Sequence, residues 1–223
     1  MNNYQYSNKL IINLSKQEHP TWCWAACAEM VTRYYSLETN QVSFVTWLYN
    51  LYEWLNKLVG HNNDDFNYVI RKILKTIFFP LIAKKIGLID STTRNFVRSQ
   101  NSSSNLNIET LSLYCQTEDI SVVYNNWGIT SKYTPNFINL YTIKEEINSK
   151  RPVQVCFELN KGDLNYGHVL LVSGYIEKNG RTYILLVDPK DGKERLLNFD
   201  DLLGLKNEYG KWQHTWLELQ KLC

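Results

Sequence analysis

The chain has little of what marks a secreted, membrane-bound or disulfide-stapled protein. Its five cysteines are few, odd in number and irregularly spaced, which argues against a disulfide framework and favours reduced thiols. The N-terminus lacks the basic start and apolar stretch of a secretory signal. The longest uncharged apolar run, residues 76–83, is far too short to span a bilayer. We therefore expect a cytoplasmic protein, or one exported without a cleaved signal peptide.

An excess of charge of one sign is also lacking. The 24 Lys and Arg against 22 Asp and Glu give a formal net charge of +2, which offers no electrostatic reason to expect a nucleic-acid partner. A basic stretch at residues 71–85 could contact an anionic membrane. Because Pro80 interrupts its apolar face, we prefer a packed helix with a solvated basic side to a membrane contact.

What is present is the composition of a folded globular protein, with 44% hydrophobic and 13% aromatic residues. A length of 223 residues suffices for one domain with a large core. Apolar residues recur with helical spacing in the first half of the chain, and this hydrophobic pattern changes after residue 120. A capping box at Thr142 and Glu145 predicts a short helix to residue 149, and strand-like runs follow at 152–158, 168–176, 182–187, 194–197 and 213–219. Helices first and strands afterwards predict an α+β protein whose halves meet at a cleft.

The segment around Cys23 carries the strongest chemical signal. Thr21 can cap a helix over residues 22–35, which places Cys23 in the first turn. A free thiol is mostly protonated at neutral pH, but the unpaired N–H groups and dipole of a helix start favour the thiolate. Gln17 lies six positions upstream and can donate its amide to a developing oxyanion, together with the backbone N–H of Cys23. Cys23 is thus a candidate nucleophile.

His168 and Asp188 are the candidate partners of this thiol. His168 follows Gly167 in a strand-like apolar run and lies 145 residues after Cys23, within the separation of about 130–150 residues typical of papain-type enzymes. Asp188 ends the next strand and would accept from the second ring nitrogen of His168. A plain two-residue turn at 179–180 would put the two side chains on opposite faces. We therefore predict an odd-length loop at 177–180 or a β-bulge in one strand.

On these residues the chain resembles bacterial papain-like cysteine proteases of the double-glycine-peptidase and avirulence-effector type. The matching positions are Gln17 and the segments 22–26, 151–153, 167–175 and 187–189. The resemblance covers roughly residues 10–36 and 140–190. It implies that residues 1–223 form a single papain-like catalytic unit, in which a helical lobe (1–118) packs against an antiparallel β lobe (119–223) with the active site in the cleft between them.

The resemblance also assigns roles to the candidate residues. It implies that Cys23 is the nucleophile, His168 the base, Asp188 the orienting group and Gln17 part of the oxyanion hole. Two features depart from the plant-type pattern. The Cys-Gly-Ser-Cys-Trp signature is absent apart from Cys23-Trp24, and Asp188 takes a role that plant enzymes give to Asn. Residues 43–118 match nothing in the family and form an atypical insert, so substrate preference is not carried over.

The expected activity is that of a cysteine endopeptidase acting on a peptide or protein, with no metal and no organic cofactor. A deamidase, a transglutaminase or a peptide cyclase would use the same triad, because the acceptor is chosen by the cleft. A catalytically silent binding module is the alternative from another class. His19, Cys23 and Cys27 stand four apart, as zinc ligands on one helix could, but Pro20 places the helix start after His19.

Three further side chains near Cys23 have simpler interpretations. Cys27, one helical turn beyond Cys23, is expected to pack in the core. Trp22 and Trp24 fit a substrate cleft and a buried core equally well. The sequence does not separate the two roles.

Overall fold

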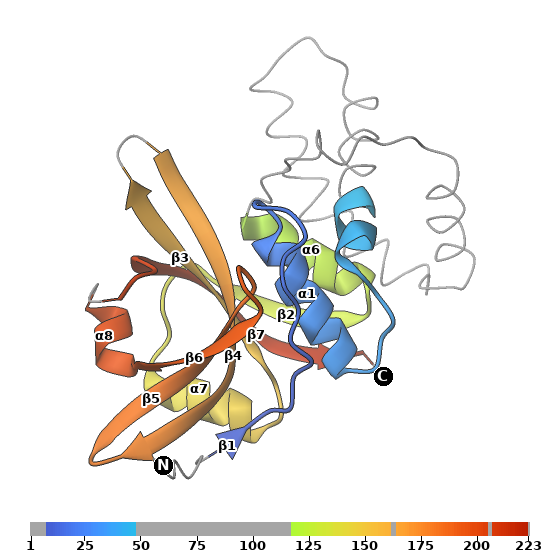
Figure 1. The fold of residues 1–223 in the computed structure, drawn as a ribbon. Helices are drawn as coiled ribbons and strands as arrows, with labels where there is room; N and C mark the ends of the chain where they lie inside the picture. The colour runs from blue at the N-terminus through green and yellow to red at the C-terminus, as the bar shows by residue number, and fades with distance from the viewer. Residues whose placement is uncertain (1–7, 48–116, 162–163, 205–206, 223) are drawn as a thin grey trace.

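The computed structural model describes residues 8–47, 117–161, 164–204 and 207–222, and the fold is α+β (Figure 1). The helices are α1 (Cys23–Tyr34), α6 (Thr117–Asn126), α7 (Leu140–Asn148) and α8 (Phe199–Leu203), and residues 41–47 are also helical. The strands are β1 (Asn8–Lys9), β2 (Ile129–Thr134), β3 (Val153–Lys161), β4 (Leu164–Lys178), β5 (Arg181–Asp188), β6 (Lys193–Asn198) and β7 (Lys211–Lys221).

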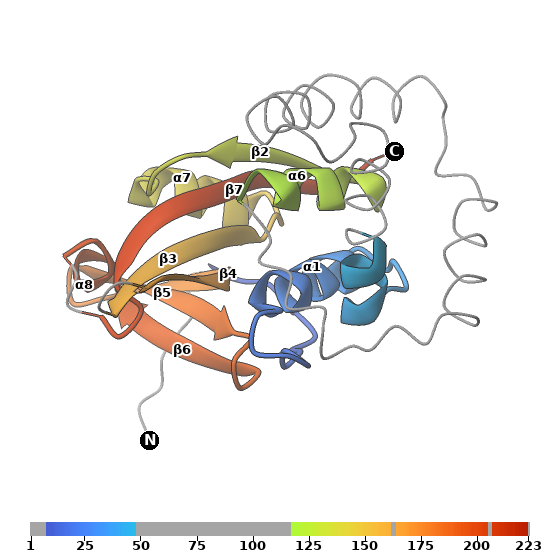
Figure 2. The same ribbon diagram turned by 90° about the horizontal axis from the view of Figure 1, so that it is seen from above.

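Within the described ranges, these strands form one antiparallel sheet in the order β2-β7-β3-β4-β5-β6, and β1 pairs with β4. Figure 2 shows this order across the sheet, and in both views α8 lies at the left-hand end of the strands, with α1 and α6 toward the right. The central strands β3, β4 and β5 are rich in Val, Ile and Leu, which suit a buried pleated surface.

Helix α1 is buried along nearly its whole length, from Cys23 to Thr32. Its three alanines favour the helix and let it pack closely against β4 and α6. The helix ends in a Schellman motif, in which the N–H of Ser36 bonds to the carbonyl of Arg33 and that of Leu37 to the carbonyl of Thr32, both at 2.9 Å. Ser36 accordingly adopts φ 59°. Cys23 is thus the first residue of a helix that is buried along most of its length and closed by backbone hydrogen bonds at its C-terminal end.

The predicted strands are confirmed as β3 to β7, each somewhat longer than the sequence pattern indicated. The helix from 22 to 35 is confirmed as α1, but its predicted cap is wrong. The N-cap is Trp22, with no side-chain cap hydrogen bond. Thr21 instead contacts His19, whose Nδ1 lies 2.9 Å from the Thr21 hydroxyl. The elements β1, β2, α6 and α8 were not predicted from the sequence patterns.

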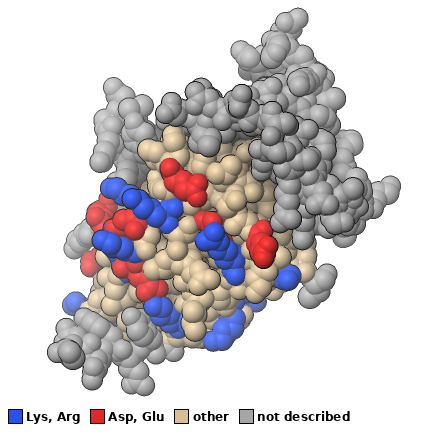
Figure 3. Space-filling view, turned by 45° about the vertical axis from the view of Figure 1, so that its right-hand side comes forward, with Lys and Arg blue, Asp and Glu red and all other residues tan. Residues whose placement is uncertain are grey.

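Some predictions from the sequence fall on residues whose structure is not described. The basic stretch 71–85 and nearly all of the insert at 43–118 lie outside the described residues. Of the helices that are described, none is long and apolar enough to cross a membrane. On the face shown in Figure 3, acidic and basic side chains are intermingled rather than gathered by sign.

Candidate active site

A β-bulge brings His168 and Asp188 onto one face of the sheet. The β4–β5 hairpin turns through two residues, Asn179 and Gly180, both at positive φ, so that Lys178 pairs with Arg181. The register then shifts between Val172 and Gly174, because Ser173 is an extra residue in β4. The regular turn alone would have separated the two side chains. The predicted bulge is therefore confirmed.

The bulge is held by the N-terminal segment of the chain. The carbonyl of Ser173 accepts from the backbone N–H of Leu10 at 2.7 Å, directly beyond the β1–β4 pairing. Gly174 lies so close to β1 that a Cβ there would approach the Asn8 carbonyl to 2.7 Å. Only glycine allows this approach. The close packing of β1 on β4 therefore stabilises the register shift at Ser173.

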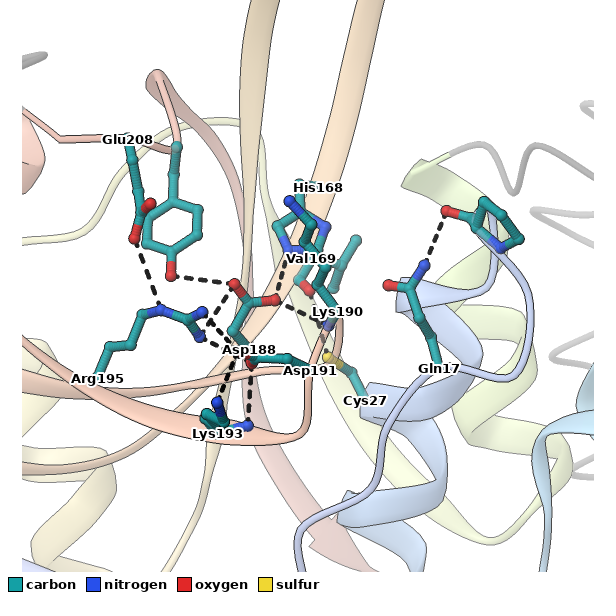
Figure 4. A network of polar contacts seen from close by, with 12 residues as sticks. Gln17, Cys27, His168, Val169, Asp188, Lys190, Asp191, Lys193, Arg195 and Glu208 are labelled. Atoms are coloured by element: carbon teal, nitrogen blue, oxygen red, sulfur yellow. Dashed lines mark hydrogen bonds and ion pairs between the residues drawn. The ribbon is translucent and has the colours of Figure 1, made fainter.

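Asp188 accepts a hydrogen bond from His168, with 2.8 Å between Asp188 Oδ1 and His168 Nε2 (Figure 4). Burial lowers the pKa of His168, but its hydrogen bond with Asp188 and its interaction with Cys23 raise that pKa above the ordinary 6.5, to about 9. Burial likewise opposes ionisation of Asp188, yet its hydrogen bond and charge interaction with His168 lower its pKa. These interactions favour the imidazolium–carboxylate form of this part-buried pair.

Cys23 is the first residue of α1, is 7% exposed, and interacts with His168 closely enough to raise the pKa of that imidazole. Since Nε2 of His168 is engaged by Asp188, Nδ1 is the ring nitrogen left for the sulfur. The backbone N–H groups in the first turn of an α-helix have no partner within the helix, so they favour a thiolate at this position. Cys23 and the hydrogen-bonded pair of His168 and Asp188 are thus brought together from three distant segments.

Gln17 is near this chain but directs its amide elsewhere. Its Nε2 donates to the carbonyls of His19 and Pro20, both at 2.9 Å, in the loop that leads into α1 (Figure 4). Its Oε1 is buried without a hydrogen-bond partner. The backbone N–H of Gln17 bonds to the carbonyl of Pro189 at 2.7 Å, next to Asp188. The residue is thus anchored at the site, while its predicted part in an oxyanion hole stays a prediction.

A buried polar network holds the chain on either side of Gln17. The fully buried Gln41 donates to the carbonyl of Lys16 at 2.8 Å and accepts from the backbone N–H of Glu18 at 2.9 Å. The Gln41 amide also donates to the Glu29 carboxylate of α1 at 3.0 Å. This network ties the arm that carries Gln17 to the helix that carries Cys23.

Two residues that sequence reasoning missed hold the second oxygen of Asp188. Tyr209 donates its hydroxyl to Asp188 Oδ2 at 3.1 Å, and Nη1 of Arg195 lies 3.2 Å from the same oxygen. Regular pairing of β5 with β6 places Arg195 diagonally across from Asp188 on the same face, so strand parity could have identified it. Tyr209 comes from the loop before β7 and has no local sequence signal.

Other side chains near Cys23 belong to the core. Trp22 and Trp24 are 1% and 2% exposed, so both pack inside rather than line an open surface. Cys27 is fully buried as expected, and its thiol lies 3.6 Å from the carbonyl of Val169. Burial, followed by nearby charge, raises the pKa of the Cys27 thiol well above its usual range. In the described part of the chain, no group of three or more His, Cys, Asp and Glu side chains could hold a metal ion.

A comparison with known protein families identifies the family of the chain. A protein-family model described as the Peptidase_C39 like family matches residues 9–221, which is nearly the whole chain. The matched residues span α1 and every strand from β2 to β7, and they include Cys23, His168 and Asp188. No curated protein matches the chain.

Proposed function

The chain belongs to the Peptidase_C39 like family of papain-like cysteine peptidases, and on this premise we propose that it is an endopeptidase that cleaves a peptide or protein through a Cys-His-Asp triad. The observation that supports this most is the His168–Asp188 hydrogen bond, with Cys23 at the start of α1 near enough to His168 to raise the pKa of the imidazole. The thiol at a helix start, the imidazole and the buried carboxylate supply a nucleophile, a base and an orienting group.

The proposed reaction begins once the proton of Cys23 resides on His168, which the raised pKa of His168 favours. The thiolate sulfur attacks the peptide carbonyl carbon, and the π electrons of the C=O bond move onto the oxygen. Collapse of this intermediate breaks the C–N bond as His168 gives its proton to the leaving nitrogen. His168 then takes a proton from water, whose oxygen attacks the thioester carbon. The C–S bond breaks, the carboxylic acid leaves, and Cys23 and His168 return to the thiolate–imidazolium pair. Asp188 keeps the imidazole oriented throughout and stabilises its charged form.

Oxyanion stabilisation is assigned to the backbone N–H of Cys23 and the side chain of Gln17. A donor of this kind typically lowers the barrier by about 2.7–4 kcal/mol. Gln17 must first move an N–H away from the carbonyl of His19 or Pro20, to which its amide now donates. Its unpartnered Oε1 supports such a rearrangement, since the present position leaves a buried acceptor unsatisfied.

The proposal is tested by mapping new peptide termini after incubating a cell extract with the full-length protein. Wild type and the Cys27→Ala variant should create the same new termini, because Cys27 is only a packed thiol. The Cys23→Ala variant should create none. Persistent cleavage by Cys23→Ala would refute the thiol mechanism. Intact substrates that gain about one mass unit, or that become joined to an amine, would replace peptide hydrolysis by deamidation or transfer.

A further inference from the structure

We propose that Arg195 and Tyr209 act as positioning residues for this triad, by holding one oxygen of Asp188 so that the other faces His168. This inference rests on the proposed function and adds to it two residues that act through Asp188. Arg195 also has an electrostatic role, because its positive charge limits how strongly Asp188 retains the proton on His168.

The four polar contacts of Asp188 are divided between its two oxygens. Oδ1 accepts from His168 Nε2 at 2.8 Å and from the backbone N–H of Lys190 at 2.9 Å. Oδ2 accepts from Tyr209 at 3.1 Å and lies 3.2 Å from Arg195. With partners on both oxygens, the carboxylate cannot rotate without breaking several contacts. The contacts on Oδ2 therefore fix the orientation of Oδ1 toward His168.

Tyr209 is suited to hold both members of the pair. Its ring stacks on that of His168, with centroids 6.0 Å apart and planes 24° from parallel, while its hydroxyl reaches Asp188. The ring also packs against Phe157, the cross-strand partner of His168, and Tyr209 is 4% exposed. Burial and then the charge of Asp188 raise the pKa of Tyr209, so it remains a donor. One side chain thus fixes the ring plane and the carboxylate together.

Arg195 is held in place by acidic residues on either side of it. Its guanidinium forms two hydrogen bonds to Asp191, at 3.0 and 2.9 Å, and its Nε lies 3.6 Å from Glu208 (Figure 4). Nη1, which donates to Asp191 Oδ1, also lies 3.2 Å from Asp188 Oδ2. A guanidinium that is anchored by its own partners loses less freedom when it orients a further carboxylate.

Titratable groups of several elements lie around the His168–Asp188 pair. They are Cys23 and Cys27 of α1, Asp191 of the β5–β6 turn, Lys193 and Arg195 of β6, and Tyr209 with its neighbour Glu208 before β7. Arg195 is the cation that contacts Asp188, and only the Asp188 carboxylate separates it from the His168 ring. Across so short a separation, removing its charge should raise the pKa of His168 by about half a unit to one unit.

The test is an NMR titration of His168 in the full-length protein labelled in its histidines, with His168→Gln assigning the signal. Arg195→Met should raise the pKa of His168 by about half a unit or more. Arg195→Lys, which keeps the charge, should leave it near the wild-type value. Lys132→Met is the matched control, because it removes an exposed positive charge that pairs with Glu218 far from the site.

Tyr209→Phe tests the positioning itself and keeps the ring that packs on Phe157. It should weaken the low-field proton signal of His168 Nε2–H, which is observed only while that proton is held against a carboxylate. An unmoved titration in Arg195→Met, or an unchanged Nε2–H signal in Tyr209→Phe, would overturn the inference. If Arg195→Met fails to fold, the Tyr209→Phe signal decides alone.

These measurements need no substrate, so they test the positioning role of Arg195 and Tyr209 separately from the proposed peptidase activity. Absent peptide cleavage together with the expected titration shifts would refute the proposed function and leave the positioning role intact. Cleavage by wild type together with unmoved His168 signals would refute only the role of Arg195 and Tyr209.

Discussion

Replacing Asp188 by Asn tests the link that the geometry makes between His168 and its carboxylate. The pKa of His168 is about 9 although burial opposes its charged form, so hydrogen bonds must outweigh burial. The hydrogen bond to Asp188 is 2.8 Å long and the His168 side chain is 16% exposed. A hydrogen bond to a charged group in such surroundings contributes about 1.5–3 kcal/mol, which corresponds to about one to two pKa units.

We therefore expect Asp188→Asn to lower the pKa of His168 from about 9 to about 7–8, as measured by NMR titration of the labelled histidine. Asp201→Asn removes the same charge from an exposed position on α8 and should leave the titration unchanged. A His168 that still titrates near 9 in Asp188→Asn would refute the reasoning, because the raised pKa would then have to come from another group.

Three further predictions concern stability. The folded-state pKa of His168 lies above its unfolded value, so protonation of His168 stabilises the folded protein. This contribution of about 3 kcal/mol to the unfolding free energy is fully present below pH 6.5 and is lost as pH rises through about 9. Urea unfolding should show this fall in wild type and not in His168→Gln. Gly174→Ala should lower the unfolding free energy by about 1–3 kcal/mol, since its Cβ would meet the Asn8 carbonyl. Unchanged stability would show that contact with β1 does not determine the position of the bulge. Gln41→Ala should lower the unfolding free energy by about 1–3 kcal/mol, because the Lys16 carbonyl and the Glu18 N–H would lose their side-chain partner. A thermal melt that matches wild type would argue against that network.

The strands were predictable because their signals are local. Runs of Val, Ile and Leu predicted β3, β4 and β5, and α1 was predicted from a cap at Thr21 that the structure does not use. The bulge was predictable as well, because strand parity leaves few ways to place His168 and Asp188 on one face once the turn is known. The structure was needed to choose the bulge over an odd-length loop and to place it at Ser173, next to the residues that pair with β1.

What the sequence did not reveal depends on contacts between particular side chains and segments. Thr21 has the side chain of a good cap, but its hydroxyl engages His19, and the helix begins without a side-chain cap. The capping box predicted at Thr142 is wrong in a similar way, because α7 begins earlier and Asn139 caps it by accepting from the backbone N–H of Thr142. Tyr209 reaches Asp188 from a separate loop, which no periodicity in the sequence encodes.

The most direct test of the central claim, that Cys23 and His168 form one reactive pair, is the rate at which iodoacetamide modifies Cys23 at pH 7. Cys27 and Cys156 serve as internal references, because burial raises the pKa of both thiols. Since the thiolate is the reacting form, we expect at least about tenfold slower modification of Cys23 in His168→Gln and no change in His214→Gln. Equal rates in wild type and His168→Gln would contradict the claim.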